Sequence, residues 1–261
     1  MKQMFQEIFQ YRDLLWMLTL RDIKIRYKQA VMGFIWAVFM PIVAICAGIL
    51  IKKAMSVVSG QPMDEKSIIS IAIKVLPWTF FISSIRFSVQ SLVGNSSLIT
   101  KIYFPRAVLP LSAILACFFD FFIASLSLPF LMVIFHVKVS IYLLWMPFFL
   151  FILVTLTAGL GLLLASANLF YRDIKYVVEI ILMFGIFFTP VFYEARSLGK
   201  FENLLLLNPI GSLLESINSA FVLRQMPDLF WLGYASLCAF VIFISGMFIF
   251  HKSEPYFAEN I

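Results

Sequence analysis

The chain has 261 residues, of which 62% are hydrophobic and 13% charged, and it carries a net charge of +6. A soluble domain averages about 25% charged residues and could not bury this much apolar surface. The composition therefore excludes a water-soluble protein and indicates an integral membrane protein. Six cationic residues lie within residues 1–30, ahead of the first long apolar run. This placement favours a membrane-facing cytoplasmic arm over a surface that binds nucleic acid.

Residues 1–30 are predicted to form a cytoplasmic amphipathic helix in the inner headgroup layer. Arg21, Lys24 and Lys28 share one face of such a helix, and apolar residues recur at helical spacing. A solvated cationic anchor without a partner is the alternative interpretation. The apolar positions are Met4, Phe5, Ile8, Phe9, Leu15 and Trp16.

The rest of the chain, 31–261, is predicted to be a single transmembrane domain, all-α, with six spanning helices. A span needs about 20 mostly apolar residues, and prolines inside it are tolerated. In the fourth span, Gly159 lies beside Thr157, Gly161 and Ala165, whose spacing of four favours close helix packing. The predicted spans are 31–51, 68–93, 107–135, 141–166, 174–193 and 229–250.

The distribution of charge predicts the orientation. Six spans place both termini on one side of the membrane. Twelve cationic residues fall in segments on that side and seven in the opposite loops, while Lys74 lies within the second span. The positive-inside rule therefore predicts a multi-pass protein with both termini in the cytoplasm.

Two connecting segments have helical patterns of their own. From Gly94 to Arg106, an Asn or Ser N-cap, a short apolar turn and a Pro predict a short cytoplasmic helix. Within 194–228, Asn208 and Pro209 resemble an N-cap and a first-turn proline. An amphipathic helix follows, which is predicted to re-enter the outer leaflet or cover the bundle, although a plain outer loop helix is the alternative. Its apolar face is Ile210, Leu213, Leu214, Ile217 and Phe221.

Few ionisable residues lie within the predicted spans. Asp120 is near the centre of the third span, where an ionised Asp costs about 2.5–3.5 kcal/mol, so it is expected to face the bundle interior. A structural hydrogen bond and a place on a transport pathway both remain open for it. Lys74 and Glu179 lie nearer the span ends and are expected to snorkel or to pair.

The sequence offers little chemistry for catalysis. It contains no G-x-x-x-x-G-K-[ST] motif, so ATP binding through a P-loop is not expected. Its two histidines, His136 and His251, lie near membrane edges, and no Cys or His residues have metal-ligand spacing. Neither catalytic residues nor a metal site are predicted on this chain.

Four segments, in order along the chain, resemble the permeases of ABC-2-type polysaccharide exporters. That family includes the O-antigen exporter permease and the capsule and teichoic-acid export permeases. The resemblance covers nearly the whole chain. The segments are Arg21–Lys28 running into Met32–Ala37 and Pro41, Asn95–Arg106 running into Val108–Leu111, Asn168–Ile174 with Phe188–Tyr193, and Leu207–Pro209.

The resemblance implies the membrane subunit of an exporter for undecaprenyl-linked polysaccharide in the bacterial cytoplasmic (inner) membrane. Two copies would form the path, and two separate P-loop ATPase chains would bind below them. ATP and Mg²⁺ would bind to those ATPase chains, and no cofactor is expected on this chain. Membrane lipid would surround it, and nucleic acid is not an expected partner. The alternatives are a permease for a drug or another lipid, an ATPase-independent channel, and a membrane enzyme acting on lipid-linked sugar.

The resemblance also assigns roles to residues. The interface helix and the Asn95–Arg106 segment would receive the ATPase motion, and the outer segment would help to form an exit gate. The cationic arm would contact either the substrate's pyrophosphate or anionic headgroups. The interface residues are Arg21, Asp22, Lys24, Arg26, Tyr27 and Lys28; the coupling residues are Asn95, Ser96, Lys101, Tyr103, Phe104, Pro105 and Arg106; and the pathway or gate candidates are Asp120, Trp78, Phe80, Phe81, Tyr193, Asn208 and Pro209.

Overall fold

The computed structural model describes residues 6–7, 9–28, 33, 35–59, 65–134, 140–257 and 259–260. Throughout these ranges the regular secondary structure is helical, as predicted. Several predicted features lie outside them. These are the apolar repeat at Met4, Phe5 and Ile8, the start of the first span at Val31, the Met32 and Phe34 positions of its motif, and His136.

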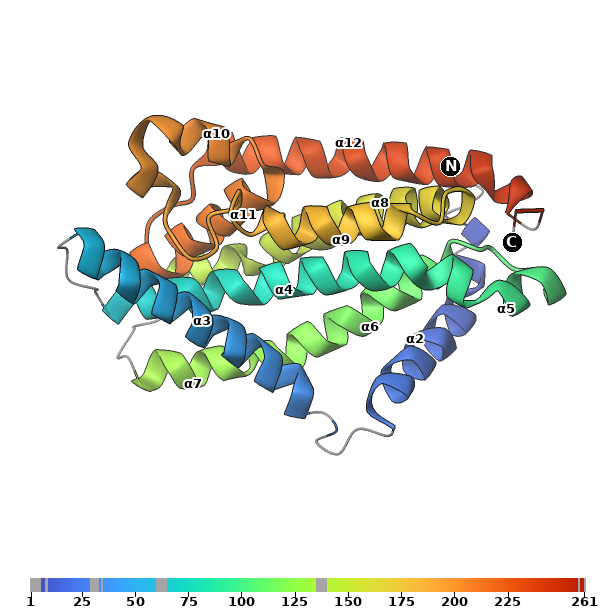
Figure 1. Cartoon of the computed structure of the whole chain (residues 1–261), viewed down its shortest axis with the longest axis horizontal. Helices are drawn as coiled ribbons and strands as arrows, with labels where there is room; N and C mark the ends of the chain where they lie inside the picture. The colour runs from blue at the N-terminus through green and yellow to red at the C-terminus, as the bar shows by residue number, and fades with distance from the viewer. Residues whose placement is uncertain are drawn as a thin grey trace.

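The long helices run along the long axis of the molecule (Figure 1). The short helix α5 (Ser96–Lys101) and both termini lie at one end, which we call the α5 end. Two further short helices lie at the opposite end, which we call the α11 end. They are α10 (Glu202–Leu206) and α11 (Pro209–Asn218), which continues into the π-helical turn η3 (Ser219–Leu223).

Five helical segments in the described ranges are long and apolar enough to cross a membrane, and they match five of the six predicted spans. The third span is divided at Leu126, and the fourth begins with a 3-10 turn. The helices are α3 (Ile35–Ser59), α4 (Glu65–Gly94), α6 (Val108–Ser125) with α7 (Ser127–Ile134), η1 (Ile141–Trp145) with α8 (Met146–Phe170), and α12 (Leu229–Ser253).

The segment predicted as the fifth span, 174–193, does not form one continuous helix. Helix α9 (Ile174–Gly185) has 12 residues, so it is about 18 Å long, well short of a hydrocarbon core of about 30 Å. Beyond it the chain continues in turns. The Thr189 hydroxyl donates a hydrogen bond to the Gly185 carbonyl at 2.8 Å, and Pro190 disfavours helical backbone at Thr189. These local features end the helix early.

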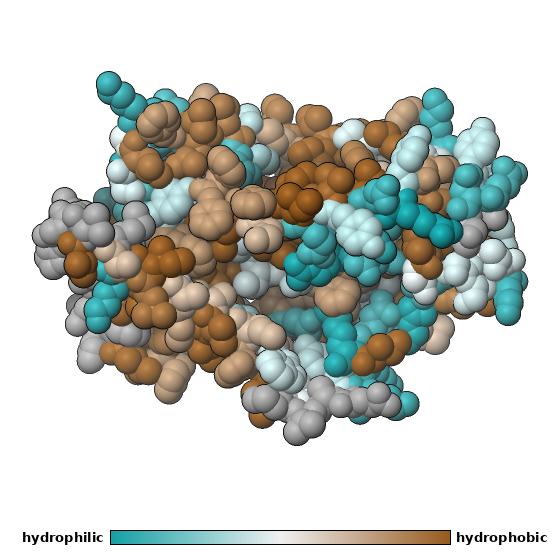
Figure 2. All heavy atoms as spheres, viewed as in Figure 1, coloured by the Kyte–Doolittle hydropathy of each residue, from teal (hydrophilic) through white to brown (hydrophobic). Residues whose placement is uncertain are grey.

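Helix α4 lies at the centre of the bundle. In its 18-residue apolar stretch 78% of the residues are buried, against 17% in the corresponding stretch of α3. It packs against α6, α8, α9 and α11, so elements from both ends of the molecule are arranged around it. On the face shown in Figure 2, hydrophobic residues cover most of the middle and the α11 end, while hydrophilic residues gather toward the α5 end.

Helices α8 and α12 make the most extensive helix–helix contact in the described chain, and glycines make it possible. A Cβ atom on Gly246 of α12 would lie 2.3 Å from the Gly159 carbonyl oxygen of α8. A Cβ atom on Gly159 would lie 2.6 Å from the backbone of Phe243. One on Gly161 would meet the Ser88 hydroxyl, also at 2.6 Å. The close packing predicted for the fourth span is therefore confirmed at Gly159 and Gly161.

This contact predicts a large stability difference between two glycines of α12. Gly246→Ala must push α8 and α12 apart, and we expect it to destabilise the protein by about 1–3 kcal/mol, the usual cost of overpacking. Gly233→Ala is the matched control, because a Cβ there meets no atom within 4 Å. Thermal unfolding of both variants in mild detergent would measure the difference. Equal melting temperatures would contradict the predicted clash.

Candidate functional site

The link between α5 and α6 presents two side chains to solvent and buries the next one. The backbone leaves the helix at Ile102 in an extended conformation. Ile102 and Tyr103 are 58% and 90% exposed, whereas Phe104 is only 7% exposed. Phe104 packs with Ile99 and Val108 in the apolar cluster at this end. Ile102 and Tyr103 thus form a protruding apolar tip, which the buried Phe104 anchors to the bundle.

The predicted coupling residues are distributed over this tip and the helix before it. An Asn or Ser N-cap was expected for α5, and Asn95 occupies that position, but its side chain makes no cap bond to α5. Its side-chain amide instead donates to the Ser91 carbonyl of α4 at 2.8 Å. Ser96 begins α5 and Lys101 ends it, with Lys101 exposed. Buried Ile99 holds the short helix against the bundle.

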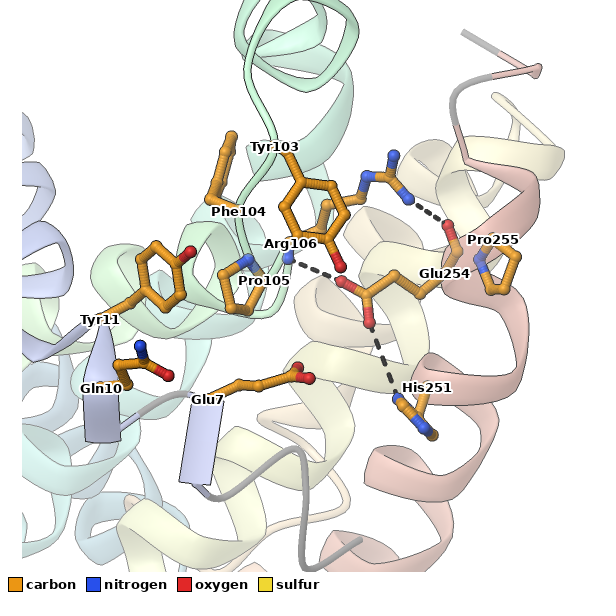
Figure 3. Close-up of a pocket in the computed structure, with 10 residues that line it drawn as sticks. All are labelled: Glu7, Gln10, Tyr11, Tyr103, Phe104, Pro105, Arg106, His251, Glu254 and Pro255. Carbon is orange, nitrogen blue, oxygen red and sulfur yellow. Dashed lines mark hydrogen bonds and ion pairs between the residues drawn. The ribbon is translucent and has the colours of Figure 1, made fainter.

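A hollow of about 570 Å³ opens beside the tip (Figure 3). Three stretches of the chain line it, within 7–11, 103–106 and 251–255. The Arg106 amide donates to a carboxylate oxygen of Glu254 at 2.7 Å, and the Arg106 guanidinium donates to the Glu254 carbonyl. Tyr and Phe rings and charged groups of both signs thus share one open surface, which suits a protein partner better than a small molecule.

Helix α2 (Arg12–Tyr27) is attached to α6 by strong polar contacts. The Arg26 guanidinium and the Tyr27 hydroxyl each donate to Asp120 at 2.6 Å, one to each carboxylate oxygen. The guanidinium also lies 3.9 Å from the centre of the Phe87 ring. Burial and the hydrogen bond to Asp120 raise the pKa of the Tyr27 phenol, which keeps it a donor. Asp120 therefore has the structural hydrogen bonds that were one of its two expected roles.

The other interface residues divide between contact and solvent. Arg21 pairs with Asp22 at 2.8 Å, and the Ser112 hydroxyl of α6 donates to Asp22 at 3.2 Å. Lys24 and Lys28 are exposed. Helix α2 thus uses one set of polar residues to bind α6 and presents another outward.

A second hollow of about 490 Å³ lies between α2, α3, α4 and α6. Its walls combine aromatic rings with two guanidinium groups, and both cations are compensated. Arg26 pairs with Asp120, and Arg86 makes two bonds to Glu179 of α9, at 2.7 and 2.8 Å. Among the predicted pathway aromatics, Phe80 lines this hollow, whereas Trp78 and Phe81 pack in the core.

At the α11 end, a fully buried cation joins three parts of the chain. Lys74 of α4 is 1% exposed, and its ammonium group donates to the Tyr193 carbonyl at 2.5 Å and to Glu215 of α11 at 3.3 Å. The same Glu215 oxygen accepts a bond from the Ala195 amide at 3.1 Å. Lys74 is therefore paired, which was one of the two outcomes expected for it, the other being to snorkel. Removing one partner would leave a buried charge unpaired.

The predicted start of the outer helix is confirmed. The Asn208 side chain accepts from the Ile210 amide at 3.3 Å, and Pro209 occupies the first turn of α11. The Asn208 amide also donates to the Thr189 hydroxyl at 2.9 Å, so the cap joins α11 to the turns after α9. The predicted apolar face is buried at every position, namely Ile210, Leu213, Leu214, Ile217 and Phe221.

Sequence reasoning missed Glu215 and Glu254. Glu215 carried a usable signal, because a carboxylate in an otherwise apolar helix needs a cation, and Lys74 is the buried cation of the second span. Glu254 follows the last span directly and gives no comparable signal. Within the ranges that the structure describes, no group of three His, Cys, Asp or Glu residues could hold a metal ion.

Five long apolar helices and cations paired inside the bundle indicate a multi-pass membrane protein. Residues 13–222 match the family described as ABC-2 type transporter, and the chain belongs to that family. It is a transport permease and not an enzyme, and family membership implies an ABC ATPase partner.

Curated relatives align along nearly the whole chain. An O-antigen export system permease protein, RfbA, from Myxococcus xanthus is 30% identical over 273 aligned residues, which cover 100% of both chains. Two proteins of the same name from Klebsiella pneumoniae are 27% and 26% identical over 95% of this chain and 94% of their own. The resemblance to O-antigen export permeases is thereby confirmed.

The contacts of Asp120 predict its effect on stability. Asp120→Ala leaves the partly buried Arg26 without its counter-ion, and we expect a loss of about 3 kcal/mol in unfolding free energy. Asp13→Ala is the control, because Asp13 is exposed and lies 3.9 Å from Arg12. Protease resistance in detergent would rank the two variants. A second test exchanges the two charges in the double variant Arg26→Asp with Asp120→Arg. If Asp120→Ala were as stable as Asp13→Ala, the ion pair between Arg26 and Asp120 would contribute nothing to stability.

Proposed function

We propose that this chain is the membrane-spanning subunit of an ABC exporter that moves an O-antigen-like, lipid-linked polysaccharide across the bacterial cytoplasmic membrane. A separate P-loop ATPase drives the export and binds ATP and Mg²⁺. The observation that carries the proposal is the end-to-end alignment with relatives named O-antigen export permeases. The undecaprenyl-type lipid carrier is part of the same proposal.

The α5 end is the proposed cytoplasmic, ATPase-binding face. Ile102 and Tyr103 are large apolar side chains exposed on a surface where hydrophilic residues gather, and such exposure favours a protein partner. The neighbouring hollow has room for a partner's side chains. Helix α2 lies beside this face and exposes Trp16 and Ile25, which suits a helix in the inner headgroup layer.

The segment 174–193 is proposed as a sixth crossing. It begins near the α5 end after α8, and Tyr193 contacts Lys74 close to α11, so the chain traverses the bundle between these points. Helix α9 and the following turns would make this crossing together. Irregular backbone at membrane depth is tolerated where it is shielded by protein or lines a cavity. With six crossings, both termini lie in the cytoplasm, as the positive-inside rule favours.

A second copy of the chain is proposed to complete the path. Helix α9 and the turns after it expose an apolar face of large side chains. In a dimer this face would be covered in part by the partner and in part by lipid. The residues that form it are Val177, Ile180, Ile181, Met183, Phe184, Phe187 and Phe188.

Purification of the tagged protein from native membranes in mild detergent tests the exporter class. We expect a P-loop ATPase in equal amount. Deleting the gene should leave lipid-linked glycan inside the cell, and restoring the gene should return it to the surface. A stable complex without an ATPase would overturn the exporter. An ATPase-containing complex with unchanged surface glycan would make the chain a permease for another substrate.

The tip residue Tyr103 gives a sharper test of the binding face. Tyr103→Ala is expected to weaken ATPase binding about tenfold, or about 1.4 kcal/mol, since Tyr is one of the residues enriched at interface hot spots. Phe201→Ala is the matched control, because Phe201 is an exposed aromatic residue near the α11 end. The amount of ATPase recovered with each purified variant measures the effect. Equal recovery from both variants would remove Tyr103 from the interface.

A further inference from the structure

Helix α12 is attached at its two ends to the two segments that the proposed function sets in motion. One is the coupling segment between α5 and α6. The other is the outer segment that leads into α11. These segments lie at opposite ends of the molecule (Figure 1), so a helix bonded to both can connect them.

At the α5 end the attachment is Glu254, in the turn η4 (Glu254–Tyr256) directly after α12. Its carboxylate accepts the Arg106 amide at 2.7 Å, and its carbonyl accepts the Arg106 guanidinium. Figure 3 shows these two bonds side by side, with His251 on the other carboxylate oxygen at 3.8 Å. Arg106 follows the exposed tip within three residues, so Glu254 fixes the base of that tip.

The turn that carries Glu254 is itself firmly held. Phe257, three residues on, is completely buried. Its ring lies 5.1 Å from the ring of Phe250 in α12 and 5.9 Å from that of Phe170 at the end of α8. Glu254 therefore moves with α12, because it belongs to a packed continuation of the helix.

At the α11 end the attachment is made by the first two turns of α12. The Tyr234 hydroxyl donates to the Leu207 carbonyl at 2.9 Å, immediately before the Asn208 cap of α11. Trp231 packs against the small apolar cluster formed by Ala195, Leu205 and Leu206. The start of α12 thus holds the chain at the point where it enters α11.

Between these attachments α12 is one unbroken helix of 25 residues, about 38 Å long. Its close contact with α8 at Phe243 and Gly246 supports it between the two attachments. A rigid, hydrogen-bonded helix of this kind can carry a displacement from one end to the other.

We propose that α12 is the strut that carries motion from the coupling segment to the outer segment, with Glu254 and Tyr234 as its positioning residues. The inference rests on the proposed exporter function. ATPase motion received at the tip would pass through Arg106 and Glu254 into α12. From there, Tyr234 and Trp231 would move the segment that begins α11.

The test compares ATP hydrolysis with glycan export in the complex of this chain and its ATPase. Tyr234→Phe, at the end of α12 away from the proposed ATPase-binding face, should keep ATPase binding and at least half of ATP hydrolysis, while export falls about tenfold. Glu254 lines the hollow of that face, so for Glu254→Ala the same tenfold fall is expected in glycan exported per ATP hydrolysed. More ATP would then be consumed per glycan exported, which a general loss of folding would not produce. Glu254→Gln is the matched control, since its amide oxygen still accepts the Arg106 amide; it should export nearly as well as the wild type.

The double variant Glu254→Ala with Tyr234→Phe gives the decisive comparison. If both residues act through α12, the double variant should export as much glycan as whichever single variant exports less. A multiplicative loss, or hydrolysis and export falling in proportion, would overturn the strut. Tyr234→Phe removes only a hydroxyl group, so it tests transmission through α12 even if Glu254→Ala fails to fold. Absence of an ATPase from the wild-type complex would defeat the proposed function instead.

Discussion

A charge placed among apolar helices needs an opposite charge beside it, and this requirement shapes the bundle. In the described part of the chain, three ion pairs join helices distant in sequence. Arg26 and Asp120 join α2 to α6, Lys74 and Glu215 join α4 to α11, and Arg86 and Glu179 join α4 to α9. Apolar packing alone would let these helices slide along one another, whereas each pair fixes a register. The interface helix and the outer segment are both positioned in this way.

Much of the fold follows from local patterns in the sequence. The face of α11 was predictable because apolar spacing and the Asn208–Pro209 start are properties of neighbouring residues. The early end of α9 was not foreseen, although Gly185 and Pro190 carry the signal for it. A window of apolar residues measures hydropathy and not helix continuity, so it cannot detect such an interruption.

In the candidate site, too, some features follow from local sequence and others depend on residues far away in the chain. The exposure of Tyr103 and the burial of Phe104 follow from a short extended stretch before a proline. The partners of Asp120 could not be predicted, because they lie about 90 residues away in the chain. Lys74 and Glu215 each signal the need for a counter-ion, but about 140 residues separate them and no local pattern joins them. Asn95 lies at the predicted N-cap position of α5, but its side chain bonds to α4, since a side chain between two helices can bond to either one. Long-range pairing is decided by the three-dimensional arrangement, and a single sequence does not contain it.

The burial of Lys74 also constrains how the protein can change over generations. A sequence that lost this lysine alone would leave Glu215 buried without its cation, and one that lost Glu215 alone would leave the ammonium group facing the Tyr193 carbonyl as its remaining strong partner. Either intermediate is less stable than the pair or than two apolar residues of similar volume. The two positions should therefore vary together among related permeases. Where both are replaced by apolar residues, packing alone would hold α11 against α4.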